Sequence, residues 1–256
     1  MEYSSQPTGE AVFGGGESLM DRETKAAHVK AVFTDIADHY DFMNSVLSLW
    51  QHKIWRRFAM KHVNLCKGGT ALDVACGTGD WTLSLAKAAG DNGKVVGIDF
   101  TREMLNVARE KLRKRGLLDR TVELVEGDAM ELPFAEDSFE VATIGFALRN
   151  VPDILTVLSE MTRVVKPGGR VVSLELSKPE APIFKSLYYL YFNHILPHIG
   201  SLAARSKKSY AWLPESLVDF PDRRGIEQLF RQAGLSDVRS YPLTGGIAAL
   251  HVGRKA

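Results

Sequence analysis

Apolar and polar positions along residues 70–176 change their period repeatedly, from short continuous apolar runs to helical spacing and back. The continuous runs predict buried strands at 70–75, 94–100, 121–127, 139–146 and 170–176. Apolar residues at helical spacing predict helices between them, at 81–89, 102–115 and 153–165. Strands that alternate with helices are typical of a parallel sheet that is covered on both faces. We therefore expect an α/β, Rossmann-like, doubly wound fold.

The two ends of the chain extend this pattern. Helical spacing over residues 21–65 predicts N-terminal helices, and a further helix is expected at 222–233. Two hairpin-like strands follow, 236–243 and 246–255, joined at Thr244-Gly245-Gly246. A parallel sheet that ends in an antiparallel pair resembles the class I methyltransferase fold. The prediction is a seven-stranded, mostly parallel sheet with an antiparallel C-terminal strand and helices on both faces.

The chain divides into a tail and one domain. Residues 1–22 are acidic and rich in glycine, and we expect them to form a flexible N-terminal tail. Residues 23–256 are expected to form a single domain that starts with helices. Within it, residues 178–220 contain aromatic residues and several prolines but few strand signals, which predicts a helical insertion over the sheet.

Composition and charge narrow the functional classes. The chain has 32 basic and 31 acidic residues and a formal net charge of +1, whereas nucleic-acid-binding proteins more often have a clear basic excess. Cys66 and Cys76 are too few for a metal site and give no sign of a disulfide framework. No basic residue precedes Arg22 and no run of ~18 apolar residues occurs, so neither a targeting peptide nor a membrane span is predicted. We expect a cytoplasmic protein with reduced thiols.

A glycine turn follows the first predicted strand, in the segment LDVACGTGD at residues 72–80. Gly77 and Gly79 let the backbone come close to a ligand beyond the carboxyl end of that strand. The dinucleotide fingerprint would have a third glycine where Thr82 stands, and a phosphate loop would have lysine where Asp80 stands. An acid at the start of a helix also competes with a phosphate for the helix N-terminus. The turn therefore favours a ligand without phosphates.

Acidic residues mark the strand ends that follow. Asp99 ends the second strand, where its carboxylate can accept hydrogen bonds from a ribose diol, each contributing roughly 1.5–3 kcal/mol. Asp128 ends the third strand and can accept from an adenine amino group, beside the backbone N–H of Ala129. Asp73, in the first strand, can orient the turn or a ligand ammonium. The set predicts a site for S-adenosylmethionine, and a structural turn with two capping aspartates is the alternative.

Three further segments carry a resemblance to a known family. They are YDFMNSVLSLWQHKIW at 40–55, FALRNVPD at 146–153 and RVVKPGGRVVSLELSKP at 163–179. From about residue 25 onward, the chain resembles the ubiquinone/menaquinone biosynthesis C-methyltransferases of the UbiE/MenG type. The resemblance implies S-adenosylmethionine-dependent methylation of a ring carbon on a polyprenylated benzoquinol, a naphthoquinol or both.

The resemblance also implies particular cofactor contacts. They are Thr78, Asp99, Asp128 with Ala129, and Gly145. Family members often have serine where Gly145 stands, so this chain lacks one hydroxyl contact while its backbone remains available at that position.

A ring carbon is a weak nucleophile until the neighbouring hydroxyl ionises, and a phenol has a pKa of ~10. A cation within hydrogen-bond reach lowers that pKa, which makes Arg149 the candidate for stabilising the quinolate. Asn150 is the candidate for orienting the same oxygen, and His52 or Tyr40 can serve as base or positioning group. Two alternatives stay open: a salt bridge at the sheet edge for Arg149, and a packing role for His52.

The expected acceptor bears on partners and location. A lipid-soluble quinol has to be reached at the membrane, so peripheral contact at its inner face, or with a quinone-biosynthesis complex, stays open. The aromatic run at 187–192 can line a channel for the isoprenoid tail, touch the bilayer or form a lid. The oligomeric state is also open, with a homodimer among the options. Two other functions are a methyltransferase for another small phenolic or lipid acceptor, and a non-catalytic scaffold subunit, which the intact turn and acids disfavour.

Overall fold

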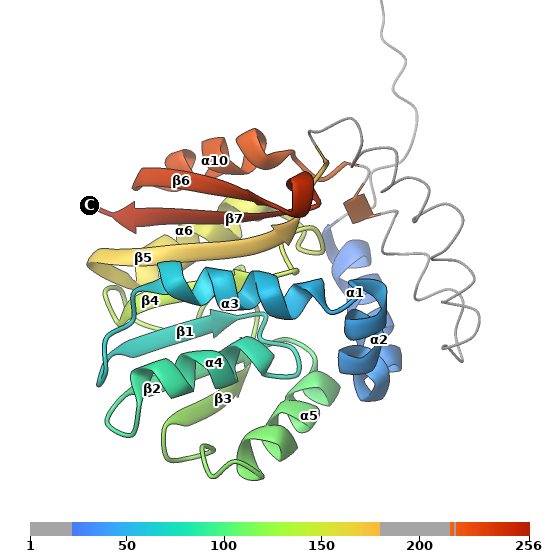
Figure 1. The fold of residues 1–256 in the computed structure, drawn as a ribbon, viewed down its shortest axis with the longest axis vertical. Helices are drawn as coiled ribbons and strands as arrows, with labels where there is room; N and C mark the ends of the chain where they lie inside the picture. Colours follow the sequence, from blue (N-terminus) through green and yellow to red (C-terminus); the bar gives the residue numbers. More distant parts are fainter. Residues whose placement is uncertain (1–21, 180–215, 218) are drawn as a thin grey trace, which may run out of the picture.

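Seven strands form a single sheet in the order β3-β2-β1-β4-β5-β7-β6 in the computed structural model (Figure 1), which describes residues 22–179, 216–217 and 219–256. The strands are β1 (Thr70–Val74), β2 (Lys94–Asp99), β3 (Val122–Glu126), β4 (Phe139–Gly145), β5 (Val165–Leu176), β6 (Leu235–Leu243) and β7 (Ala248–Lys255). β1 to β5 pair in parallel, whereas β7 runs antiparallel to both of its neighbours, β5 and β6. The predicted seven-stranded, mostly parallel sheet is therefore confirmed.

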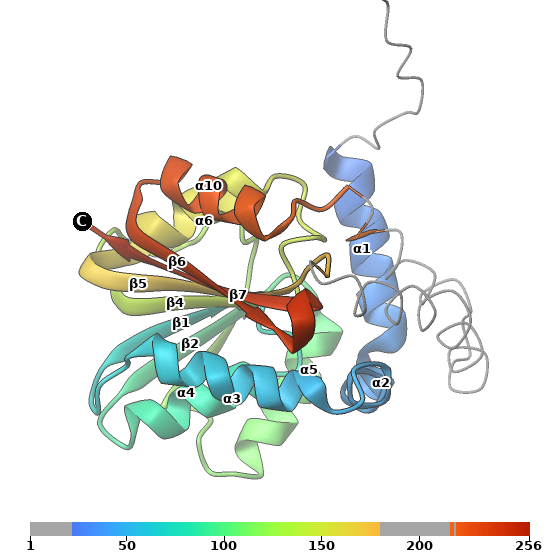
Figure 2. The same ribbon diagram turned by 45° about the horizontal axis from the view of Figure 1, so that its top comes forward.

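Helices pack against both faces of this sheet. Those described are α1 (Arg22–Ile36), α2 (Tyr40–Leu47), α3 (Gln51–Val63), α4 (Asp80–Ala89), α5 (Arg102–Arg113), α6 (Ile154–Val164) and α10 (Arg223–Gln232), with short turns η1 (Ala37–His39) and η3 (Thr244–Gly246). α3, α4 and α5 lie against one face, and α6 and α10 against the other (Figure 2). α1 and α2 lie beyond the carboxyl ends of the parallel strands, the edge at which such sheets bind ligands.

Side chains that alternate along the strands fill two apolar layers, one on each face. Leu72 of β1 belongs to the layer under α6 and α10, whereas its neighbour Ala71 belongs to the layer under α3 and α4. α3 adds Trp55, Ala59 and Val63 to that second layer, spaced four residues apart along one helical face. The strand ends that carry the candidate site thus belong to a sheet that is packed on both faces.

The chain between α6 and β5 differs from the sequence prediction. Pro167-Gly168-Gly169 was expected to separate a helix from a strand that starts at Arg170. The strand starts at Val165 instead, directly after α6, and the three residues form a bulge where the register between β4 and β5 shifts. Gly168 has a φ of +79°, a left-handed value that costs glycine little, so the bulge does not end the strand.

Two predicted segments lie largely outside the described residues. The tail predicted over 1–22 is described only at Arg22, where α1 begins. The insertion predicted over 178–220 is described only at its ends, and the aromatic run at 187–192 falls between them. Within the described ranges, no helix combines the length and the apolar character needed to cross a bilayer.

Acid should weaken this fold through His251 on β7. Burial lowers the pKa of His251 from 6.5 to about 4, and its Nε2 lies 2.9 Å from the carbonyl oxygen of Arg223. The unfolded chain therefore binds more protons than the folded chain between these two pKa values, so this contribution to stability is complete above the higher value and falls as the pH drops. When the pH is lowered from about 7 to 5, the unfolding free energy of the wild type should fall by about 2 kcal/mol more than that of the variant His251→Gln. Urea unfolding at both pH values measures the difference, and equal losses would contradict it.

Candidate functional site

The turn after β1 forms the floor of the site. Ala75, Gly77 and Gly79 have φ values of 50°, 54° and 79°, all in the left-handed region. Gly79 precedes α4, and a Cβ there would lie 3.1 Å from the Cβ of Ala108 on α5. A Cβ on Gly77 would have no neighbour within 4 Å. Gly79 thus allows α4 and α5 to pack closely, whereas Gly77 leaves open space above the turn.

Asp99 at the end of β2 holds this turn in place. Its Oδ2 accepts a hydrogen bond of 2.8 Å from the backbone N–H of Gly77, and its Oδ1 accepts one of 2.8 Å from the N–H of Thr101. The residue is only 6% exposed, and burial raises the pKa of its carboxyl. Each carboxylate oxygen keeps a second acceptor position, which suits the two hydroxyls of a ribose.

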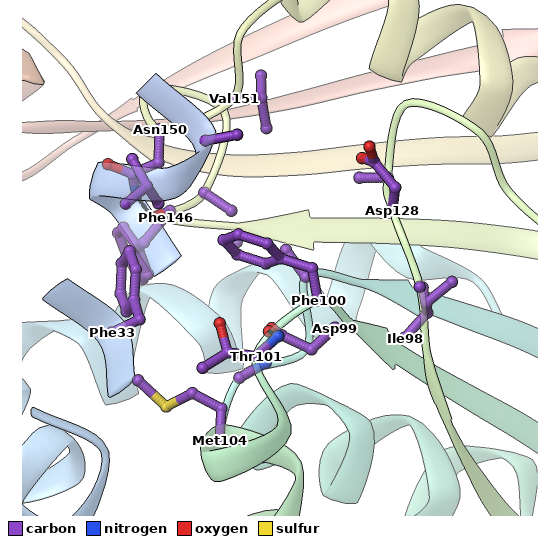
Figure 3. A pocket seen from close by; sticks show the side chains of 18 of the residues that line it. Phe33, Ile98, Asp99, Phe100, Thr101, Met104, Asp128, Phe146, Asn150 and Val151 are labelled. Carbon is purple, nitrogen blue, oxygen red and sulfur yellow. Dashed lines mark hydrogen bonds between the residues drawn. The ribbon is translucent and has the colours of Figure 1, made fainter. Parts of the chain in front are cut away.

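A cavity that is open to solvent lies beside Asp99, and about 820 Å³ of empty space, part of it open solvent, falls within its bounds. Its apolar walls come from α1, the strand ends and the chain after β4, and include Val29, Phe33, Ile98, Phe100, Met104, Phe146 and Val151. Its polar lining residues include Tyr40, Asp99, Thr101, Asp128 and Asn150. In Figure 3, Asp99 and Phe100 lie between Asp128 on one side and Phe33 on the other. A mostly apolar pocket with a few converging polar groups is typical of a small-molecule site.

Asp128 and Ala129 follow β3, as predicted, and both line this cavity. The Asp128 side chain is exposed, and its Oδ1 accepts a hydrogen bond of 2.8 Å from the N–H of Met130. A Cβ on Gly127 would lie 2.8 Å from Cδ1 of Ile98, so a larger residue here would require the Ile98 side chain to shift. The local backbone therefore places both residues at the cavity.

A second cavity, also open to solvent, adjoins the first across the glycine turn. The two cavities share the lining residues Tyr40, Ala75, Gly77, Gly145 and Phe146. The second cavity is rich in polar side chains, namely Asp41, Asn44, Arg56, Asp73, Thr78 and Asp80. We call the two the apolar cavity and the polar cavity. Together they offer one binding region with different chemistry on either side of Gly77.

A lysine on α5 connects the acids of the polar cavity. Nζ of Lys111 lies 2.6 Å from Oδ2 of Asp41 and 2.7 Å from Oδ1 of Asp80. Nη1 of Arg56 lies 2.9 Å from Oδ2 of Asp80, and the hydroxyl of Thr78 donates a bond of 2.5 Å to Asp41. Sequence reasoning missed these partners because up to 70 positions separate them, so no spacing pattern marks them.

Asp73, which was expected to orient the turn or a ligand ammonium, lines the polar cavity and contacts two threonines. Its carboxylate accepts hydrogen bonds of 2.6 Å from the hydroxyl of Thr82 on α4 and 2.8 Å from that of Thr143 on β4. Burial raises the pKa of its carboxyl to about 6. Asp73 thereby links β1 to α4 and β4.

Arg149 forms the ion pair that the sequence left open as the alternative to catalysis. Its Nη1 lies 3.4 Å from Oε2 of Glu175 on β5 and donates a hydrogen bond of 2.6 Å to the carbonyl of Phe146. Oε1 of Glu175 accepts bonds of 2.6 and 2.7 Å from the N–H groups of Ala147 and Leu148. Burial raises the pKa of Glu175, and Arg149 opposes this shift. Within the described part of the chain, the buried Nε of Arg149 has no hydrogen-bond partner.

The remaining catalytic candidates separate into two groups. Tyr40 and Asn150 line the apolar cavity, whereas His52 and Arg149 line neither cavity. Burial raises the pKa of Tyr40, so its hydroxyl stays neutral at neutral pH. His52 is 5% exposed, its Nδ1 lies 2.7 Å from Oγ of Ser48, and burial lowers its pKa to about 4. These features match the packing role left open for His52.

Gly145 lies where the two cavities meet. A Cβ at this position would lie 2.8 Å from Cε3 of Trp81 on α4. The indole ring therefore occupies the space into which a serine side chain would project, and the bare backbone of Gly145 packs against it.

Comparisons with known proteins bear on the family. The sequence model of the ubiE/COQ5 methyltransferase family matches residues 21–255. Demethylmenaquinone methyltransferases from Bacillus pumilus and Bacillus subtilis are 53% and 51% identical to this chain; each match covers 91% of the chain, and 99% and 100% of the respective relative. The Staphylococcus aureus protein of the same name is 48% identical, over 93% of this chain and 97% of its own length.

Solved structures share the fold at low sequence identity. A S-adenosylmethionine-dependent methyltransferase from Aquifex aeolicus has a TM-score of 0.58 and 22% identity, over 78% of this chain and 89% of that one. Another from Thermotoga maritima has a TM-score of 0.62 and 18% identity, over 90% and 100%. The fold likeness agrees with the family match, which spans nearly the whole sequence. The resemblance found in the sequence is confirmed: this chain belongs to the ubiE/COQ5 methyltransferase family.

Proposed function

We propose that this protein transfers the methyl group of S-adenosylmethionine to a ring carbon of demethylmenaquinol, a polyprenylated naphthoquinol. The family match and the relatives named demethylmenaquinone methyltransferase, at 53% identity and below, support this reaction. The observation that carries the proposal is the pair of adjoining cavities, one apolar beside Asp99 and Asp128 and one polar beside Thr78. A nucleoside joined to an amino acid matches this pair, since the nucleoside suits the apolar cavity and the charged amino acid suits the polar one.

The residues at the two cavities fit S-adenosylmethionine. Asp99 keeps acceptor positions for the ribose hydroxyls, and Asp128 with the N–H of Ala129 suits the edge of an adenine. In the polar cavity, Asp41 and Arg56 suit the ammonium and carboxylate of the methionine part. When bound, S-adenosylmethionine supplies an electrophilic methyl group on a sulfonium sulfur.

The acceptor ring belongs beside Gly145, where the two cavities meet. Asn150 and Tyr40 line the adjoining wall and can hydrogen-bond to the quinol oxygen. Arg149 stays protonated, so it is no base; it lines neither cavity, and it acts by holding the chain after β4, which carries Asn150, through Phe146 and Glu175. The ring carbon of the ionised quinol then attacks the methyl group. Alignment of carbon, methyl and sulfur is the main contribution of the protein, and water accepts the ring proton. His52 has no proton-transfer role in this scheme, because it lines neither cavity.

Loss of the gene tests the proposed reaction. Cells that lack the protein should accumulate a quinone that is one methyl group short, which mass spectrometry of extracted lipids detects. Purified protein should methylate demethylmenaquinol in preference to the methoxy-polyprenyl benzoquinol, the other acceptor class of the family. An unchanged quinone pool would exclude quinol methylation, and a preference for the benzoquinol would reassign the acceptor.

Replacing Asp99 with asparagine should weaken cofactor binding about 10- to 100-fold, because charged hydrogen bonds to the ribose contribute about 1.5–3 kcal/mol. Calorimetric titration with S-adenosylhomocysteine measures the dissociation constant. Asp237→Asn removes an exposed carboxylate from β6, far from both cavities in sequence, and should leave the constant unchanged. If Asp99→Asn also bound normally, Asp99 would only hold the turn.

Arg149→Lys should lower kcat about 10- to 100-fold while cofactor affinity is retained, because the chain that carries Asn150 would shift and misplace the quinol. A lysine is a point charge and cannot contact both Phe146 and Glu175 as the planar guanidinium does. Steady-state kinetics with saturating cofactor give kcat.

The matched control is Arg163→Lys on α6. Arg163 likewise pairs with a glutamate, Glu160, and donates to backbone carbonyl groups, those of Leu132 and Phe134, but these contacts do not hold the chain that carries Asn150. This control should lower the melting temperature without lowering kcat. Unchanged turnover in Arg149→Lys, or the same loss of kcat in both variants, would remove Arg149 from the mechanism.

A further inference from the structure

Large apolar side chains are exposed at the corner between α2 and α3. Phe42, Leu49, Trp50 and Ile54 have exposed fractions of 63%, 61%, 54% and 55%. Within the described part of the chain, these four are the exposed large apolar residues, and all of them fall between positions 42 and 54. We call this set the apolar corner. Exposed apolar side chains that gather in one place mark an interaction site.

The backbone of the corner adopts an unfavourable conformation without burying these side chains. Leu49 and Trp50 have φ values of 47° and 59°, in the left-handed region that bulky residues rarely adopt. The turn is held by a hydrogen bond of 2.8 Å from the N–H of Trp50 to the carbonyl of Ser45. Packing inside the described domain does not account for two large apolar residues at such positions.

The exposed side of α3 carries positive charge next to the corner. Lys53, Arg57 and Lys61 are exposed and recur every four residues, so they lie along one side of the helix. We call them the basic stripe. None of the three forms an ion pair with a described residue, and α3 contains no acidic residue. Trp50 and Ile54 lie on the same side, whereas the residues that α3 buries occupy the opposite side.

We propose that the apolar corner and the basic stripe together form a docking surface for a lipid bilayer that contains anionic headgroups. Large apolar side chains at one end of a helix and basic side chains along the same side are the arrangement of interfacial helices. The basic stripe would contact the anionic headgroups while the apolar corner enters the boundary of the acyl region. A two-fold contact between copies of this surface is disfavoured, because α3 offers no acid to face the basic stripe.

The docking surface adjoins the candidate site. Tyr40 of α2 lines both cavities, and Phe42, two positions later on the same helix, points to the other side and into solvent. α2 and the first turn of α3 lie at the carboxyl edge of the parallel strands (Figure 1). Docking would therefore bring the edge with the cavities close to the bilayer. Delivery of a membrane-borne quinol to this edge rests on the proposed function, whereas the docking itself does not.

Vesicle co-sedimentation tests the docking without any catalytic assay. The full-length protein is mixed with vesicles of phosphatidylcholine alone or with added phosphatidylglycerol. We expect binding that requires phosphatidylglycerol and weakens as salt rises. Absence of binding to either vesicle would overturn the proposal, whether or not the protein methylates quinols. Binding without quinol methylation would instead leave the docking surface intact and refute the proposed function.

Charge reversal locates the contact. The triple variant Lys53→Glu/Arg57→Glu/Lys61→Glu should lower the partition constant by at least about 100-fold, since loss of each basic residue near an anionic surface costs roughly a factor of five and the added carboxylates are repelled. The control Arg113→Glu/Lys114→Glu/Arg115→Glu changes the net charge equally at three exposed positions at the end of α5. It should bind about as the wild type does. Equal losses in the two triple variants would reduce the effect to net charge and overturn the proposal.

The apolar corner has its own test, at constant charge. Trp50→Gln/Ile54→Gln should lower the partition constant about 10-fold, because less apolar surface enters the bilayer. The melting temperature and the affinity for S-adenosylhomocysteine of each variant verify that the fold is retained. Binding equal to that of the wild type would overturn the role of the apolar corner. Sedimentation velocity gives the remaining outcome: a wild-type dimer that this double variant dissociates would reassign the surface to contacts between copies.

Discussion

The carboxylate of Asp99 is the contact on which the site depends. It joins the N–H of Gly77, in the turn after β1, to the N–H of Thr101, which precedes α5. Buried backbone N–H groups need acceptors, and a carboxylate is a strong one, so one side chain fixes two neighbouring strand ends. A ligand on this turn is consequently positioned by the sheet itself. The carboxylate keeps acceptor positions of its own, so stabilising the turn and binding a ribose do not compete.

Glu175 holds the backbone on the other side of the site in the same way as Asp99 does. It accepts the N–H groups of Ala147 and Leu148 and pairs with Arg149, so the chain after β4 is held by a strand-end carboxylate as the glycine turn is. Burial raises the pKa of both Asp99 and Glu175, while their hydrogen bonds favour the charged forms. The site therefore contains hydrogen-bond acceptors that are fixed on rigid backbone. Such acceptors suit the hydroxyls of a ligand and need no reorganisation when the ligand binds.

The sequence predicted the acids at the strand ends but not their partners. Asp99 and Asp128 were found because parallel strands bring their carboxyl ends to one edge, so position in the sequence implies position in space. In the sequence, Lys111 cannot be distinguished from the other lysines of an amphipathic helix that face solvent. Its contacts with Asp41 and Asp80 arise only from the way α5 packs. Glu175 is an acidic residue in an otherwise apolar strand, and the sequence alone does not show which groups it contacts. His52 was a candidate base because histidine often transfers protons. Its burial and its contact with Ser48 depend on the folded structure, so the sequence did not reveal them.

α2 shows how the cavity and the proposed docking surface are related. A helix at the surface of a domain normally buries one side and exposes polar residues on the other. In α2, Met43 is buried and Tyr40 lines the cavities, yet Phe42 is exposed, so this short helix is apolar towards solvent as well. Its outer side has no packing role among the described residues, which is consistent with the proposed contact with a bilayer. Because cavity and outer side belong to one helix, about 10 Å separates them, which an isoprenoid chain spans with its ring in the site and its tail in the bilayer.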